Sequence, residues 1–128
     1  MNIRVIKLED IPPEVMSAGR KSNLLFPDKP SAVYFGGYEG DKLVTFMCLV
    51  LNKDRTASIK SNFTVEDHRG KGYFTELNRH CLAYAREHGV KRILLNCLPD
   101  SVGVHQKAGA RVWKTTRNIT WMVYDKGF

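Results

Sequence analysis

The spacing of apolar residues changes abruptly after Val65, and this change constrains the fold more than any other feature of the sequence. Before it, apolar residues alternate with polar ones or form short blocks, a pattern typical of strands. Beyond residues 66–73, the side chains of Phe74, Leu77 and Cys81 recur at spacings of three and four, which predicts an amphipathic helix. The chain therefore combines a sheet with helices, and residues 66–73 join a strand to a helix.

The other elements follow from the same periodicities and from turn and cap residues. Before the junction we expect a strand at 2–7, a helix from an Asp10 N-cap to Ser22, two strands within 31–51 joined at 39–41, and a strand at 56–65. After it we expect a helix ended by Gly89, a strand at 91–98 buried on both faces, a short helix from Asp100 or Ser101 to Gly109, and a hairpin turning at 117–118. The order β-α-β-β-β-α-β-α-β-β predicts one mixed α/β domain over residues 1–128.

The net charge of +7 is concentrated in one part of the chain. Up to His68 there are nine basic and nine acidic residues, whereas Arg69–Arg117 holds ten basic and three acidic residues. A concentrated positive field favours an anionic partner, such as a phosphorylated cofactor, a nucleic acid or an acidic protein. A solvated basic surface explains the same charge without a partner, so charge alone does not choose.

Hydropathy and cysteine content favour a protein of a reducing compartment. No apolar run approaches the roughly 20 residues of a membrane helix, and the first ten residues lack the features of a secretory signal. Cys48, Cys81 and Cys97 lie in apolar segments and are expected to be buried free thiols. We therefore expect a cytoplasmic protein with no membrane partner.

The glycine-containing junction has the composition of a phosphate cradle. The start of a helix presents unpaired backbone N–H groups and the positive end of the helix dipole. Gly70 and Gly72 allow left-handed dihedrals and close approach of a ligand, and Arg69 and Lys71 add positive charge. The spacing matches neither a Walker A loop nor a GxGxxG fingerprint. The alternative is a turn whose glycines only relieve strain.

The segment VEDHRGKGYFTEL resembles motif A of the GNAT superfamily of N-acetyltransferases, whose signature is Q/R-x-x-G-x-G/A. Residues Arg69 to Phe74 occupy the six positions in order, and the expected elements fall in the family's order along most of the chain. The resemblance implies a GNAT-like, mostly antiparallel twisted sheet flanked by helices. It also implies a coenzyme A-dependent N-acyltransferase, with acetyl-CoA or another acyl-CoA as co-substrate and no metal.

The resemblance assigns the cofactor to the strand before motif A and to the loop itself. The implied residues are Phe63, Thr64 and Val65 for the pantetheine arm, and Arg69, Gly70, Lys71, Gly72, Tyr73 and Phe74 for the pyrophosphate. The arm is expected to lie in a slot between this strand and the strand at 93–98. Ser101 either reaches the pantetheine or caps a helix. Phe74 stands where the family has Gly or Ala, and either crowds the pyrophosphate or turns into the core.

The resemblance also suggests candidates for proton transfer. Glu66, at the end of the strand before motif A, is the first candidate for the general base, and Asp67 and His68 are its neighbours. Each can equally be a solvated loop residue. His105, in VHQKAGA, stands where the family has a tyrosine that protonates the departing thiolate. It is either that acid or a histidine packed beneath the cofactor.

Three functional hypotheses remain open from the sequence. The first is an acyltransferase acting on an amine of a small molecule or protein, held near residues 22–30 and the aromatic residues Phe26, Tyr34 and Tyr38. The basic excess disfavours a cationic acceptor. The second is a GNAT-fold enzyme of phage type that modifies nucleic acid, with which Trp113, Trp121 and Tyr124 are compatible. The third is a non-catalytic CoA-binding module. A homodimer through the closing hairpin is compatible with all three.

Overall fold

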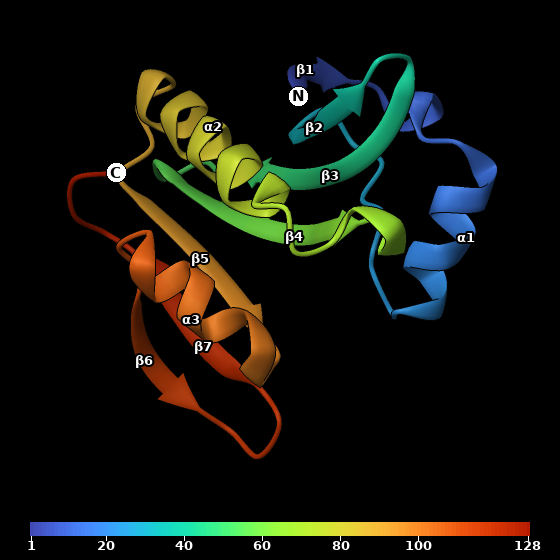
Figure 1. Cartoon of the computed structure of the whole chain (residues 1–128). Helices are drawn as coiled ribbons and strands as arrows, with labels where there is room; N and C mark the ends of the chain where they lie inside the picture. The colour runs from blue at the N-terminus through green and yellow to red at the C-terminus, as the bar shows by residue number, and fades with distance from the viewer.

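Seven strands form one continuous sheet in the computed structural model, which describes residues 1–128 (Figure 1). The strands are β1 (Asn2–Ile6), β2 (Ala32–Glu39), β3 (Lys42–Leu51), β4 (Thr56–Thr64), β5 (Arg92–Cys97), β6 (Arg111–Thr115) and β7 (Thr120–Tyr124). The helices are α1 (Pro13–Lys21), α2 (Tyr73–Glu87) and α3 (Pro99–Lys107), with short 3₁₀ turns η1 (Leu8–Asp10) and η2 (Glu66–His68). The expected order of strands and helices is confirmed.

The sheet is mixed and mostly antiparallel, as expected. Its strand order is β1-β2-β3-β4-β5-β7-β6, and only β4 and β5 run parallel. Helix α2 is the crossover that joins these two strands, because parallel neighbours cannot be linked by a tight turn. The strand order places this parallel pair in the interior of the sheet, and the glycine-containing junction follows directly after β4.

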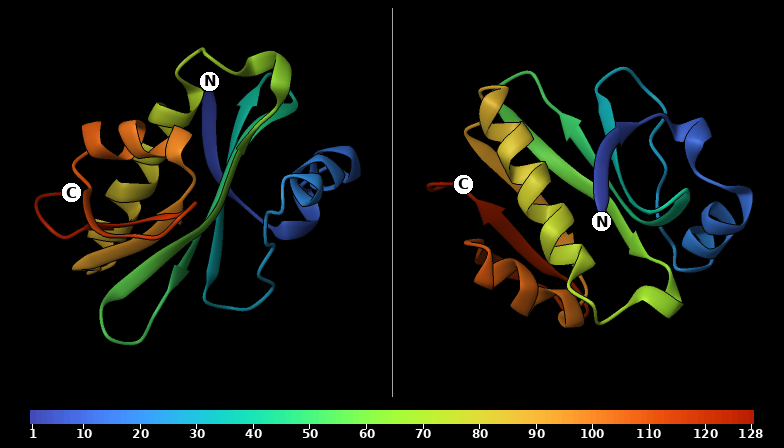
Figure 2. Two further views of the ribbon diagram at one scale, coloured as in Figure 1. Left: turned by 90° about the horizontal axis from the view of Figure 1, so that it is seen from below. Right: turned by 45° about the horizontal axis from the view of Figure 1, so that its top comes forward.

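Helices cover both faces of the sheet, α1 on one and α2 with α3 on the other (Figure 2). Each layer encloses an apolar cluster, and full burial of a Leu or Phe side chain stabilises the fold by about 1.5–3 kcal/mol. The cluster on the α2 and α3 side consists of Phe35, Met47, Leu49, Ala57, Ile59, Leu77, Cys81, Leu82, Ala85, Val90, Ile93, Leu95, Ala110, Met122 and Tyr124. The α1 side consists of Ile6, Ile11, Val15, Tyr34, Tyr38, Leu43, Phe46, Cys48 and Val50.

Two helices begin at different residues from those expected. Asp10 caps η1 instead of α1, since its Oδ2 accepts the Lys7 N–H at 2.8 Å. Pro13 then disfavours helical dihedrals at the preceding Pro12, whose ψ is 144°, so α1 begins only at Pro13. Helix α3 begins at Pro99, because proline suits the first helical position, and this places Ser101 inside its first turn.

Strand β5 is buried on one face only, so the expectation of burial on both faces was wrong. Ile93 and Leu95 are buried against the α2 side, whereas Leu94 is 36% exposed and Asn96 is exposed. The cluster beneath α1 takes no residue from β5, β6 or β7. The second face of this half of the sheet therefore has no helix over it.

The cysteines are free, as expected, and two of the three are buried. Cys48 and Cys81 lie in the two apolar clusters, and Cys97 is half-buried. Burial raises the pKa of the Cys48 thiol to about 11, which keeps it protonated near neutral pH. No helix is both long enough and apolar enough to cross a membrane.

Candidate active site

A slot opens between β4 and β5, where the parallel pairing stops early. The strands pair only at Thr56–Arg92, Ala57–Ile93 and Ser58–Leu94, and then diverge in a V (Figure 1). A bulge at Lys60 accompanies the divergence, since Leu49 pairs with Ile59 while Cys48 pairs with Ser61. Bulges increase local twist, which turns the second half of β4 away from β5. The backbone of β4 beyond Ser58 thus faces β5 without a partner strand.

The loop that closes the wide end of the slot has open backbone donors. Gly70 and Gly72 adopt φ of +78° and +79°, in the left-handed region that favours glycine. The amides from Gly70 to Thr75 donate no hydrogen bond within the chain. A Cβ on Gly70 or Gly72 would meet no atom within 4 Å outside its chain neighbours, so Phe74 does not fill this space, and the Tyr73 ring stacks on His68 with centroids 6.3 Å apart. The loop and the positive end of α2 together suit an anion.

The strand end before the loop is partly bonded within the chain. The Phe63 carbonyl accepts a hydrogen bond from the Thr45 hydroxyl at 2.9 Å, and the Val65 amide donates one to the Val44 carbonyl at 2.8 Å. Arg69 turns back along β4, where its Nε–H donates to the Thr64 carbonyl at 3.0 Å. Its guanidinium must therefore move before it can contact a ligand over the glycines. Lys71 is exposed beside them.

Three buried polar side chains are linked by hydrogen bonds where α2, α3 and β7 meet. Asn78 donates from Nδ2 to the Tyr124 hydroxyl at 3.2 Å, and this hydroxyl lies 2.6 Å from Nδ1 of His105. His105 is fully buried, and the ring of Phe74 packs perpendicular to it with centroids 5.4 Å apart. His105 Nε2 and Asn78 Oδ1 have no hydrogen-bond partner. Phe74 is half-buried and lies outside the main cluster, against the histidine.

Burial determines the charge of this histidine. It lowers the pKa of His105 to about 4, because removing the imidazolium from water disfavours the charged form. Burial likewise raises the pKa of the Tyr124 hydroxyl to about 12. Both groups are therefore neutral near pH 7. This environment favours the second interpretation of His105, a histidine packed beneath the cofactor.

Ser101 and Glu66 come from the elements that follow the two strands of the slot, since α3 follows β5 and η2 follows β4. Ser101 is half-buried in the first turn of α3, where its side chain makes no cap. Glu66 is exposed and lines a cavity of about 340 Å³ with Phe63, Val65 and Arg69 of the strand end. Glu14 and Lys21 of α1 close its other side. Of these two residues, only Glu66 lines the cavity between α1 and the end of β4.

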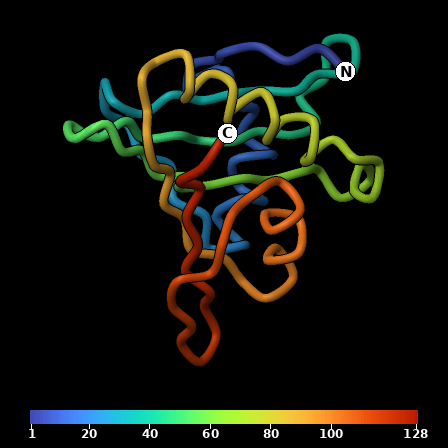
Figure 3. The backbone as a smooth tube through the Cα atoms, turned by 90° about the vertical axis from the view of Figure 1, so that its left-hand side faces the viewer, coloured from blue at the N-terminus to red at the C-terminus, as the bar shows by residue number.

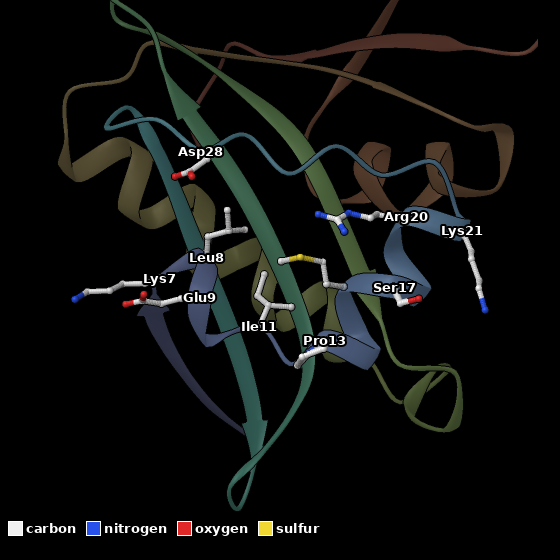
Figure 4. A pocket seen from close by; sticks show the side chains of 10 residues that line it. Lys7, Leu8, Glu9, Ile11, Pro13, Ser17, Arg20, Lys21 and Asp28 are labelled. Carbon is white, nitrogen blue, oxygen red and sulfur yellow. The ribbon is translucent and has the colours of Figure 1, made fainter.

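A cavity of about 810 Å³ lies away from the glycine loop. Residues of η1 and α1 form its walls, with Asp28 from the loop that follows α1 (Figure 4). It contains no residue of motif A. The aromatic residues expected near an acceptor do not line it either: Tyr34 and Tyr38 are buried, and Phe26 packs on Phe46 with centroids 5.7 Å apart. For Tyr34 and Tyr38, burial overturns the expectation that they face an acceptor.

A family comparison decides the relationship suggested by motif A. The sequence profile of the acetyltransferase (GNAT) family matches residues 4–110. The chain belongs to this family. GNAT membership makes it an N-acetyltransferase and supports an acyl-CoA co-substrate. Among curated protein sequences none matches the chain.

Solved structures agree with the GNAT fold. An IAA acetyltransferase from Bacillus cereus superposes with a TM-score of 0.78 at 15% identity, covering 95% of this chain and 97% of that one. The ribosomal-protein-S18-alanine N-acetyltransferase from Escherichia coli gives 0.76 at 12%, with coverages of 99% and 96%. A Bacillus subtilis acetyltransferase in complex with CoA gives 0.72 at 15%, with 97% of both chains covered. At these identities the likeness shows the fold alone.

Sequence reasoning missed Asn78 and the role of Tyr124. The signal for Asn78 was present, since a polar residue four positions after Phe74 and three before Cys81 lies on the apolar face of α2. A buried amide requires a partner, so its position predicted a polar group opposite. That this group is Tyr124, 46 residues away, depends on the packing of β7 against α2.

Proposed function

We propose that this GNAT enzyme transfers an acyl group, acetyl in the simplest case, from acyl-CoA to an amine acceptor by direct attack in a ternary complex. One observation carries the proposal: the unpaired amides of Gly70–Thr75 stand at the wide end of the slot between β4 and β5. A diphosphate bound at this point accepts hydrogen bonds from these amides, and the pantetheine arm of the same molecule extends into the slot. Phe63 and Thr64 offer it backbone groups, and Ser101 a hydroxyl from α3.

In the proposed reaction, Glu66 removes a proton from the acceptor amine. Its carboxylate lines the cavity of about 340 Å³ at the end of β4, where an acceptor can approach the thioester. The amine nitrogen bonds to the acyl carbonyl carbon, and the carbon–sulfur bond then breaks. Holding both reactants together makes the step effectively intramolecular, which supplies much of the rate.

His105 is proposed as a hydrogen-bond donor to the departing sulfur. Its neutral ring offers Nε2–H once Phe74 moves aside, because Nδ1 is engaged by Tyr124. Complete proton transfer is not required, since a thiol with a pKa of about 8.5 leaves readily as thiolate near neutral pH. His105 thus stabilises the developing charge.

The acceptor is proposed to be an amine of a small molecule or a protein. One similar structure is that of an IAA acetyltransferase from Bacillus cereus, and another is that of the ribosomal-protein-S18-alanine N-acetyltransferase from Escherichia coli. These names support both classes.

Calorimetry with acetyl-CoA tests the proposal directly. We expect saturable binding of one acetyl-CoA per chain, competed by CoA, followed by thiol release when a panel of amines and peptides is added. Binding without thiol release across the panel would favour the non-catalytic module. Absence of binding would refute the assignment of the glycine loop.

A further inference from the structure

The β6–β7 hairpin projects from the body of the protein with little covering it (Figure 3). All five residues of β6 are exposed, including Trp113 at 51%. At the end of the hairpin, Ile119 is 37% exposed. Exposed apolar side chains gathered in one place indicate an interaction site, because scattered ones need no explanation but a patch does.

Part of this exposed surface lies on the face of the sheet that has no helix, whereas Val112 pairs with Met122 and lies on the other face. Cross-strand partners point to the same side, so the pairs Leu94–Val123 and Lys114–Trp121 place these side chains on one face. The opposite face carries Met122, which is buried in the main cluster. Trp113 and Trp121 lie 6.1 Å apart, between ring centroids. Trp121 is half-buried and Val123 is buried, so the open face presents the exposed indole ring of Trp113 beside the partly covered ring of Trp121.

The charged residues of the hairpin itself are all positive. Residues 111–124 contain Arg111, Lys114 and Arg117 and no acidic residue. Arg111 is neutralised by Asp125, which accepts from its Nη2 at 2.7 Å, whereas Lys114 and Arg117 have no carboxylate partner. The Lys114 ammonium lies 5.7 Å from the centroid of Trp121. A second copy of the chain is a poor occupant, because two such hairpins would oppose like charges.

We propose that the hairpin and the open face of β5 bind single-stranded nucleic acid. The chemistry of single-stranded nucleic acid matches this surface, because unpaired bases stack on indole rings and phosphates pair with nearby lysine and arginine side chains. Trp113 is the stacking platform, and Lys114 and Arg117 contact the backbone. The site goes beyond the proposed acetyl transfer and involves none of the residues assigned to acyl-CoA.

The two tryptophans make the test specific, because Trp113 and Trp121 are the only ones in the chain. Titration with oligothymidylate of about twelve nucleotides, within the site sizes typical of such proteins, should quench their fluorescence saturably. Trp113→Ala should weaken binding about five- to hundredfold, from the loss of one stacked base. The double variant Lys114→Gln with Arg117→Gln should reduce the salt slope by about 1.4, for two phosphate contacts.

Matched measurements separate this site from general attraction to a basic protein. Lys53→Gln removes one positive charge from the distant, exposed β3–β4 turn and should leave the affinity nearly unchanged. Acetyl-CoA binding by each variant checks the fold and keeps the outcome independent of the proposed transferase activity. The proposal would be overturned if the oligonucleotide caused no quenching at low salt, or if Lys53→Gln weakened binding as much as the hairpin variants do. It would also be overturned if polyglutamate bound as tightly as the oligonucleotide, or if sedimentation showed a dimer that Trp113→Ala dissociates.

Discussion

The hydroxyl of Tyr124 lies 2.6 Å from Nδ1 of His105, at the buried contact between β7 and α3. The same hydroxyl accepts the Nδ2–H of Asn78, so its own proton is free to go to the histidine. No other acceptor contacts it, and we therefore assign the imidazole proton to Nε2. Tyr124 thus fixes the tautomer of His105 and leaves Nε2–H as the only donor that the ring can offer.

Removing this hydroxyl should destabilise the fold. Tyr124→Phe leaves His105 Nδ1 and Asn78 Nδ2 buried without partners, and each such group costs about 1–3 kcal/mol. We expect the free energy of unfolding in urea to fall by about 2–6 kcal/mol, the sum for the two groups. Tyr84→Phe is the matched control, since the Tyr84 hydroxyl makes no hydrogen bond in the chain. Equal losses in the two variants would contradict the role of the Tyr124 hydroxyl.

Stability should fall as the pH drops from about 6.5 towards 4. The pKa of His105 is about 4 in the folded chain, against 6.5 as its ordinary value, so the unfolded chain binds more protons in this window. Stability therefore rises with pH here, and His105 accounts for about 3 kcal/mol of the change. Denaturant unfolding at several pH values measures the slope.

His105→Gln identifies the source of that slope. The variant keeps a polar side chain beside Tyr124 but has no proton to gain above pH 4. Its unfolding free energy should change less between pH 6.5 and 4 than that of the unaltered protein. An unchanged slope would show that the acid sensitivity comes from other groups.

Phe74→Ala should uncover His105 and raise its pKa. Burial is the sole cause of the lowered value, and Phe74 packs directly against the imidazole. An NMR titration of the His105 ring should therefore show a midpoint above 4, closer to 6.5. The same variant decides how Phe74 affects the cofactor. Tighter acetyl-CoA binding indicates that the ring narrows the site, and unchanged affinity indicates that it only covers the histidine.

Local patterns predicted the elements that depend on local chemistry. The left-handed glycines around Lys71 and the length of α2 follow from dihedral preferences and apolar spacing, which act within a few residues. Gly89, with φ of +76°, ends α2 as expected. The position of motif A between β4 and α2 was predictable for the same reason.

Features that depend on packing between distant segments were not predictable. The apolar run of β5 fits a strand buried on both faces, but whether a helix covers the second face depends on where α1 lies. Helical spacing with Leu77 is compatible with Phe74 in the core, yet α3 brings His105 against its ring. Likewise, no local pattern distinguishes a proton donor at position 105 from a buried neutral ring.

Glu66→Gln should slow acyl transfer without changing acyl-CoA binding. The glutamine keeps the size of the side chain but cannot accept the amine proton, and general-base catalysis typically contributes about a hundred- to ten-thousandfold. We expect kcat/KM in a thiol-release assay to fall within that range. Asp67→Asn is the control, because Asp67 is a neighbouring exposed carboxylate that does not line the cavity beside Glu66. Comparable losses in both variants would point to a general charge effect.

A pair of glycine substitutions should separate backbone strain from ligand contact. Gly72 and Gly89 have almost the same φ, +79° and +76°, and a Cβ on either meets no atom within 4 Å. Alanine in this left-handed conformation costs about 1–2 kcal/mol, so both variants should lose similar stability. Only Gly72→Ala places a methyl group in the space proposed for the diphosphate, and we expect its Kd for acetyl-CoA to rise at least about tenfold, or 1.4 kcal/mol. Gly89→Ala, at the far end of α2, should bind acetyl-CoA as the unaltered protein does. Because alanine has the same conformational cost at both positions, a difference between the two variants in Kd for acetyl-CoA comes from contact with the ligand. Equal Kd values would place the diphosphate elsewhere.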